Sequence, residues 1–204
     1  MTNYITALKT AKPVAFGGFS ELFIIGGRAC KLLEDGHYPD VLEECIMQKQ
    51  AADAGLAPQV YNVFKRGDDA AVVMDAIDFT THRHPDGGED DGAPCLMGEM
   101  QTDEMIRAAK LYARLILKNV LHCDFHCGNV ILADDGNDFA IDFGIAATLG
   151  TASLKYLNRA AMFLIPVLDR LDMISEQNQL MDAYNDADSI RALLPQIAKS
   201  LLAA

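Results

Sequence analysis

The first third of the chain alternates short apolar runs with turn residues, which is the pattern of β-strands. The expected strands come from four such runs: Val14 to Ile25, Arg28 to Leu33, Val60 to Phe64 and Ala70 to Met74. The turn Gly26-Gly27 joins the first two, and residues 66–69 join the last two. Tight turns between apolar runs favour antiparallel pairing. The pattern therefore predicts a small antiparallel sheet at the start of the chain.

A single helix is expected between the second and third strands. Pro39 suits a first helical turn, and Asp40 and Glu43 place negative charge near the helix N-terminus. The helical pattern runs to about Ala54, and Gly55 is a suitable C-terminal residue.

The rest of the chain is predicted to be mainly helical. After a boundary near residues 75–80, residues 82–94 are polar and rich in Gly and Pro, as in a surface loop. Thr102 is the expected N-cap of a helix, and a second helix over residues 154–168 should bend or break at Pro166. A third covers residues 190–202. We expect an α+β fold of two lobes, residues 1–76 and 77–204.

Composition narrows the classes of function. The net charge is −12 and Lys and Arg form no cluster, so nucleic acid and anionic membrane are not expected partners. No apolar run approaches the ~20 residues of a membrane span. Residues 1–12 lack the basic and apolar segments of a cleaved signal peptide. The five cysteines, an odd number, are expected to be reduced thiols.

The strongest chemical pattern is the segment His122-Cys123-Asp124-Phe125-His126-Cys127-Gly128-Asn129, followed thirteen residues after Asn129 by Asp142-Phe143-Gly144. Two short apolar runs joined by a turn lie between them, so a hairpin should bring Asn129 and Asp142 to the same end. Phosphoryl transfer needs a carboxylate beside the accepting hydroxyl and oxygen ligands for magnesium. Asp124 suits the first role, and Asn129 with Asp142 the second.

This segment resembles the catalytic loop and the Asp-Phe-Gly motif of protein kinases. The resemblance implies that Asp124 is the catalytic base and that Asn129 and Asp142 bind Mg²⁺. His126 stands where protein kinases usually have Lys, and in this respect the loop is similar to aminoglycoside phosphotransferases and other small-molecule kinases. The loop alone leaves the choice between protein and small-molecule acceptors open.

A zinc site is the competing interpretation of the same stretch, because it holds two His and two Cys. The four residues form adjacent pairs, His122-Cys123 and His126-Cys127, which one short segment cannot easily wrap around a tetrahedral ion. Zinc would also leave Asp124, Asn129 and Asp142 without a role.

The first third supplies a candidate cation for nucleotide phosphates. Lys31 ends the run Arg28-Ala29-Cys30-Lys31, which resembles the kinase strand that carries the phosphate-binding Lys. Glu44 on the following helix is the expected carboxylate partner, and Glu43 is the alternative.

The resemblance also implies the residues that contact ATP. Gly17, Gly18, Phe19 and Ser20 would form the loop over the phosphates, although the outer glycines of the usual pattern are replaced. Ala29 would lie against the adenine, with Met74 behind it, Asp75 and Ile77 offering backbone groups to its edge, and Ile131 below it.

These elements occur in kinase order from Ala15 to Gly144, but no long activation segment follows. A trimmed kinase of this size resembles the minimal kinases that bacteria inject by type III secretion, most of all the HopBF effector family. That resemblance implies an ATP- and Mg²⁺-dependent serine/threonine kinase of host heat-shock protein 90, delivered into the host cytoplasm and monomeric. A small-molecule phosphotransferase and a catalytically inactive docking module are the alternatives.

Overall fold

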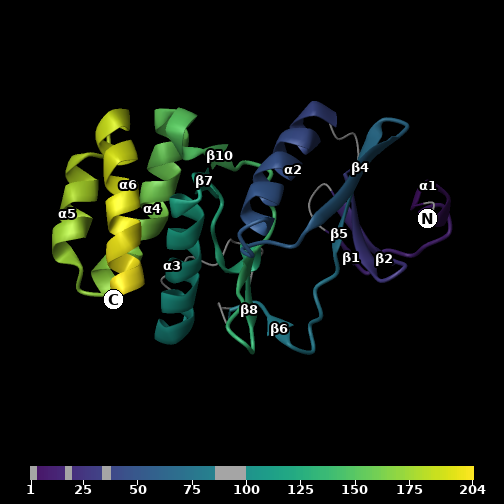
Figure 1. Ribbon diagram of the computed structural model, residues 1–204, viewed down its shortest axis with the longest axis horizontal. Helices are drawn as coiled ribbons and strands as arrows, with labels where there is room; N and C mark the ends of the chain where they lie inside the picture. Colours follow the sequence, from purple (N-terminus) through teal and green to yellow (C-terminus); the bar gives the residue numbers. More distant parts are fainter. Residues whose placement is uncertain (1–3, 17–19, 34–37, 86–99) are drawn as a thin grey trace.

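The computed structural model describes residues 4–16, 20–33, 38–85 and 100–204. Figure 1 shows a sheet at the N-terminal end of the molecule, a group of helices at the C-terminal end, and helix α2 (Tyr38–Ala52) standing between them. The two-lobed α+β architecture expected from the pattern is confirmed.

The N-terminal lobe is built on a five-stranded antiparallel sheet with the order β1-β2-β3-β5-β4. Its strands are β1 (Ala15–Phe16), β2 (Ser20–Ile25), β3 (Arg28–Leu33), β4 (Val60–Arg66) and β5 (Asp69–Asp75). Gly26 and Gly27 turn the chain between β2 and β3 with φ of 60° and 78°, a region that glycine enters without steric cost. The register places Lys31 between Leu22 and Val72 in the centre of the sheet.

The two faces of this sheet are covered by different elements. One face buries Phe23, Leu32 and Val73, together with Leu8 after the short helix α1 (Tyr4–Ala7). On the other face, Val41 and Cys45 of α2 pack against Ala70 and Val72 of β5. Alternating side chains of β5 therefore serve both cores, which fixes α2 over the sheet.

The C-terminal lobe consists mainly of four helices: α3 (Thr102–Leu117), α4 (Leu154–Arg170), α5 (Ile174–Asp182) and α6 (Ala187–Ala203). Tyr112, Leu157 and Leu164 are fully buried in its core. The same core includes Ala51 of α2 and Leu56 just after it. The C-terminal end of α2 therefore packs into the second lobe and joins the two.

Several short strands lie between the N-terminal sheet and the C-terminal helices (Figure 1). β7 (Val120–Leu121) pairs with β10 (Ala147–Thr148), and β8 (Val130–Ala133) pairs with both β6 (His82–Arg83) and β9 (Phe139–Ala140). The hairpin expected between Asn129 and Asp142 is confirmed, because Val130 lies opposite Ala140. Beyond this pair, the Ile141 amide donates to the Asn129 carbonyl at 3.0 Å, so the two site residues leave the same end of the hairpin.

Three local predictions differ from the structure, wholly or in part. The N-cap of α3 is Gln101, and Thr102 is the first helical residue, with its hydroxyl accepting from Arg170. Pro166 lies inside α4 and does not break it, since the helix continues to Arg170 with Val167 and Leu168 beyond the proline fully buried. The alternative of a bend at Pro166 stays a prediction. Residues 82–83, expected in a loop, form β6 instead. Most of that expected loop, residues 86–94, lies outside the described residues.

Within the described part of the chain, no helix is both long and apolar enough to cross a lipid bilayer.

A buried carboxylate fixes the turn of the site hairpin. Asp138 is 3% exposed, receives the Ala133 amide at 3.0 Å, and pairs with the guanidinium of Arg107 on α3. We expect Asp138→Ala to lower the free energy of unfolding by about 2–3 kcal/mol, because the Ala133 N–H loses its acceptor and the Arg107 guanidinium loses its counter-ion and keeps the Ala133 carbonyl. Urea unfolding measures this loss. The matched variant Asp135→Ala, in the same turn but exposed, should lose under about 1 kcal/mol. Equal losses in the two variants would contradict this role.

Candidate active site

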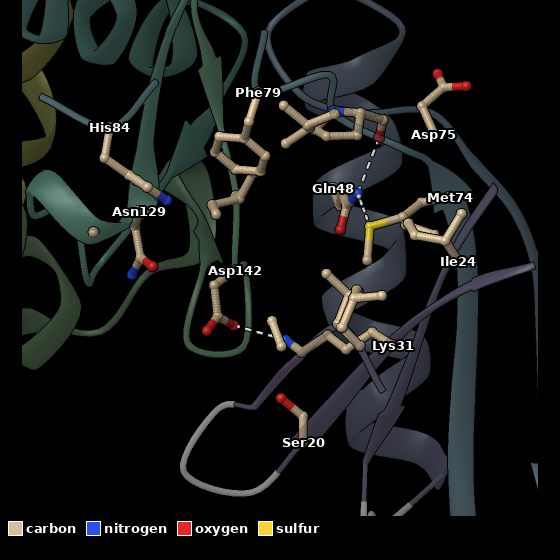
Figure 2. Close-up of a pocket in the computed structure, with 18 of the residues that line it drawn as sticks. Ser20, Ile24, Lys31, Gln48, Met74, Asp75, Phe79, His84, Asn129 and Asp142 are labelled. Carbon is tan, nitrogen blue, oxygen red and sulfur yellow. Dashed lines mark hydrogen bonds and ion pairs between the residues drawn. The ribbon is translucent and has the colours of Figure 1, made fainter. Parts of the chain in front are cut away.

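A cavity of about 590 Å³ lies between the lobes, and Figure 2 shows side chains from both lobes turned toward it. Its sheet side is formed by residues of β1, β2 and β3, including Ser20, Ala29 and Lys31. Its other side includes Asn129 and Asp142, which lie together at the open end of the hairpin. Gly128, Asn129, Ile141 and Asp142 of the second lobe thus share one cavity with the sheet.

The central interaction of the cavity is a lysine between two carboxylates. Lys31 Nζ donates to Glu44 Oε1 at 3.0 Å and to Asp142 Oδ1 at 3.0 Å. Lys31 and Glu44 are largely buried, whereas the Asp142 side chain is about half exposed. Burial alone would lower the pKa of Lys31, but the charges of Glu44 and Asp142 outweigh it and raise that pKa. Burial likewise opposes ionisation of Asp142, and the Lys31 ammonium more than compensates, so the pKa of Asp142 is lowered. The Lys31 ammonium and the Asp142 carboxylate therefore each favour the charged form of the other.

The alternative between Glu43 and Glu44 is resolved by the face of α2 on which each lies. Glu44 is buried on the side toward β3, whereas Glu43 is exposed. Because Cys45 and Val41 of the same helix pack on the sheet, α2 has one rotation in which only Glu44 reaches Lys31.

Asp142 adopts a backbone conformation that side chains rarely take, with φ of 59°. It directly follows the last hydrogen bond of the hairpin, which Ile141 makes to Asn129. Residues held in this left-handed region cluster at functional sites, where the surrounding structure compensates the strain. Here the conformation lets the carboxylate turn back toward Lys31, as Figure 2 shows.

The loop that carries Asp124 is held by its own polar groups. The Asn129 side-chain amide donates to the Asp124 carbonyl at 2.9 Å. His126 Nδ1 accepts from the Gly128 amide at 3.1 Å, and His126 Nε2 lies 3.1 Å from the Asn129 amide nitrogen. These contacts close the short helix η2 (Cys127–Asn129). They leave the Asp124 carboxylate about half exposed, 3.7 Å from His126.

His122 supports the loop from below. It is 1% exposed, and its Nε2 lies 2.7 Å from the Ile141 carbonyl, which can only accept, so Nε2 carries the proton. Its ring meets Phe125 and Phe143 edge-on, at centroid distances of 5.4 and 4.8 Å. Burial lowers the pKa of His122, so the ring is neutral at pH 7. It connects the loop of Asp124 with the residue before Asp142.

Most of the residues predicted to contact a nucleotide line the cavity. Ser20, Ala29, Met74, Asp75 and Ile77 all do so. Gly17, Gly18 and Phe19 lie outside the described residues. Asp124 and His126 are not among the lining residues and lie beside the cavity, next to Asn129.

One predicted position is corrected. Ile131, expected below the adenine, is fully buried and does not line the cavity. It pairs with Phe139 inside the hairpin, and Ile141, directly before Asp142, lines the cavity instead. Ile131 and Ile141 belong to the same face of the hairpin, since Ile131 lies opposite Phe139 and Ile141 lies opposite Asn129. Ile141 lies at the open end of the hairpin beside Asp142 and reaches the cavity, whereas Ile131 lies further in and is covered.

Sequence reasoning missed several lining residues. Gln48, Phe79 and His84 all contribute to the cavity wall. Only Gln48 gave a usable signal, because it lies one helical turn after Glu44 on the same face of α2. Phe79 and His84 lie in an irregular segment, where no periodicity indicates the direction of a side chain.

The donors of the site suit a hard cation. In the described parts of the chain, no cluster of three or more His, Cys, Asp or Glu side chains is arranged to hold a metal. Mg²⁺ is commonly bound by one or two carboxylates with substrate phosphates and water completing its shell. The Asp142 carboxylate and the Asn129 amide oxygen fit that pattern, since the Asn129 nitrogen already donates to the loop.

The cysteines of the loop behave as packing residues. The Cys123 thiol donates to the carbonyls of Leu121 and Tyr156, and burial raises its pKa to about 12. Cys127 is also buried. A metal-bound cysteine must be deprotonated, so these observations speak against the zinc interpretation.

The chain has a protein-kinase-like fold. It consists of two lobes around a cavity, with the Lys31–Glu44 pair in the first lobe and the Asn129–Asp142 hairpin in the second. The family model of the ABC1 atypical kinase-like domain matches residues 99–172. The matched segment contains the Asp124 loop and Asp142, so the similarity covers the second half of the site. No curated protein matches the chain.

The buried neutral His122 predicts a specific pH dependence. Its pKa lies below the ordinary value of 6.5, so the unfolded chain takes up a proton there that the folded protein does not. Stability should therefore fall as the pH drops below about 6.5, by up to about 1.4 kcal/mol per pH unit from this residue. Urea unfolding between pH 7.5 and 5.5 measures the slope, which His122→Gln should reduce by that amount. Parallel slopes in the two proteins would contradict a buried neutral His122.

Proposed function

We propose that this chain is an ATP-dependent phosphotransferase that transfers the γ-phosphoryl group to a hydroxyl. The observation that supports this most strongly is the pairing of Lys31 with Glu44 and Asp142 on a cavity between the lobes. The partly matching ABC1 atypical kinase-like domain model supports the same class of activity.

The proposed roles follow from the position of each residue. The adenine would lie between Ala29 and Ile141, at the hinge residues 74–77, and the Lys31 ammonium would bind the phosphates. Asn129 and Asp142 would hold Mg²⁺, which neutralises phosphate charge when bound. Asp124 would orient the accepting hydroxyl and take its proton, while that oxygen forms a bond to the γ-phosphorus and the bond from phosphorus to ADP breaks.

A protein serine or threonine is the acceptor that we propose first. Asp124 is about half exposed beside the cavity, so a side chain on another protein can approach it. The chain enters α4 at Leu154, soon after Gly144, as expected from the sequence, and this leaves a short segment beside the site. The resemblance to the HopBF effector family supports heat-shock protein 90 as the first substrate to test, and delivery to a host cytoplasm by type III secretion as its setting.

A small-molecule acceptor is the second candidate, and His126 is the observation that favours it. Its ring bonds to the loop through Gly128 and lies close to Asn129 and Asp124. Protein kinases usually have a lysine at this place, whereas a histidine resembles aminoglycoside phosphotransferases and other small-molecule kinases.

The roles of Asp124 and Asp142 predict a clear mutational result. Asp124→Ala should lower kcat by about 10²–10⁴, since general-base catalysis is lost, without a loss of stability because this carboxylate is exposed. Asp142→Asn should abolish most transfer. Labelled-phosphate transfer from ATP measures both. The matched variant Asp134→Asn, in the exposed turn of the same hairpin, should retain wild-type activity. Transfer at the wild-type rate by Asp142→Asn would defeat the proposal.

The acceptor class can be separated in one assay. We expect labelled phosphate from Mg·ATP to reach protein bands in a eukaryotic lysate and purified heat-shock protein 90, with serine or threonine as the modified residue by mass spectrometry. Aminoglycosides and sugars tested in parallel should remain unlabelled. Labelling of these small molecules alone would show that the acceptor is a small molecule and not a protein. Absence of any transfer or Mg·ATP binding would favour a docking module.

A further inference from the structure

Gln48 is a buried polar residue on the back wall of the cavity, and the mechanism above does not use it. It is 3% exposed and lies one turn after Glu44 on α2. Among the described residues of α2, Glu44 and Gln48 line the cavity. A buried amide needs hydrogen-bond partners for both its nitrogen and its oxygen.

The orientation of the Gln48 amide is fixed by its neighbours. Its Nε2 lies 2.9 Å from the Pro58 carbonyl, which can only accept, so the nitrogen must face Pro58. The second N–H of the same group points to the Met74 sulfur at 3.4 Å. Both donors are thereby used, and what Gln48 still offers is the acceptor oxygen.

That oxygen is turned toward the cavity. Figure 2 shows the amide nitrogen on the two dashed hydrogen bonds and the oxygen on the opposite side of the group, toward the half of the cavity that contains Lys31. Met74 lies beside it at the end of β5, just before the hinge residues Asp75 and Ile77. The Gln48 oxygen would therefore lie at the inner edge of a base bound at the hinge, where it can accept a hydrogen bond.

We propose that Gln48 selects the nucleotide base, by accepting a hydrogen bond from an exocyclic amino group on the edge of the base that faces the back wall. The contact is direct or passes through one water molecule. Adenine carries an amino group at C6, with two hydrogens, so that one can serve the hinge and the other Gln48. Guanine carries a carbonyl oxygen at the same position, which would face the Gln48 oxygen as a second acceptor. This inference rests on the proposed nucleotide site and extends it to the choice between ATP and GTP.

The test compares the binding of three Mg²⁺-nucleotides by titration calorimetry: ATP, GTP and the triphosphate of purine riboside, which lacks the C6 amino group. The hinge would also contact the C6 substituent of the base. The decisive quantity is therefore the change on mutation in the ratio of two dissociation constants, that of purine riboside triphosphate divided by that of ATP. We expect Gln48→Leu to reduce that ratio about tenfold, the value of one buried hydrogen bond, mainly through weaker ATP binding. GTP discrimination should fall in the same variant.

Matched variants separate base selection from support of the helix. Gln50→Leu removes an amide of the same helix that donates to the Lys118 carbonyl and does not line the cavity, so the wild-type ratio should persist. Gln48→Met, which keeps the length of the side chain, gives the same measurement where Gln48→Leu fails to fold.

The outcomes distinguish failure of base selection by Gln48 from failure of the nucleotide site itself. If Gln48 only positions α2, its variants should weaken the three nucleotides equally, and an unchanged ratio would overturn the inference while leaving the phosphotransferase proposal intact. If the wild-type protein binds none of the three nucleotides, the proposed function fails and this inference fails with it.

Discussion

The Lys31 ammonium is the charge at which the two lobes meet in the site. It is mostly buried, and a buried charge is costly unless it is paired. One partner, Glu44, comes from the helix over the sheet, and the other, Asp142, comes from the second lobe 111 residues along the chain. The pairing of this one cation with both carboxylates therefore depends on the relative position of sheet, helix and hairpin. As a result, the Lys31 ammonium and the half-exposed Asp142 carboxylate face the same cavity.

Apolar packing sets up that meeting, and polar contacts refine it. Val41 and Cys45 set the rotation of α2, and the end of that helix is packed into the core of the second lobe through Ala51. On the other side, His122 hydrogen-bonds the residue before Asp142, and Asp138 fixes the turn of the hairpin. Glu44 and Asp142 are thus each positioned by buried neighbours that do not themselves line the cavity.

The sequence was informative wherever a local rule determines the structure. Glycine turns and apolar runs located the strands, and the order of Lys31, Glu44, Asn129 and Asp142 predicted which side chains gather. The errors share another cause, since each depended on contacts far along the chain. Ile131 and Ile141 lie on the same face of the hairpin, and only the packing around it decides that Ile141 reaches the cavity. Pro166 remains helical because buried neighbours hold it. Gln48 was overlooked because a glutamine on a helix is usually exposed, and only the folded chain shows its partners Pro58 and Met74.

Thermal unfolding with and without nucleotide tests whether Lys31 and Asp142 meet at a magnesium–nucleotide site. If the Lys31–Asp142 convergence is a magnesium–nucleotide site, ATP with Mg²⁺ should raise the Tm of the wild-type protein, as ligands that bind only the folded state do. ATP without Mg²⁺ should raise it much less, and Asp142→Asn should remove the difference that Mg²⁺ makes. A Tm that ATP does not change, or an equal rise in Asp142→Asn with Mg²⁺, would contradict the account.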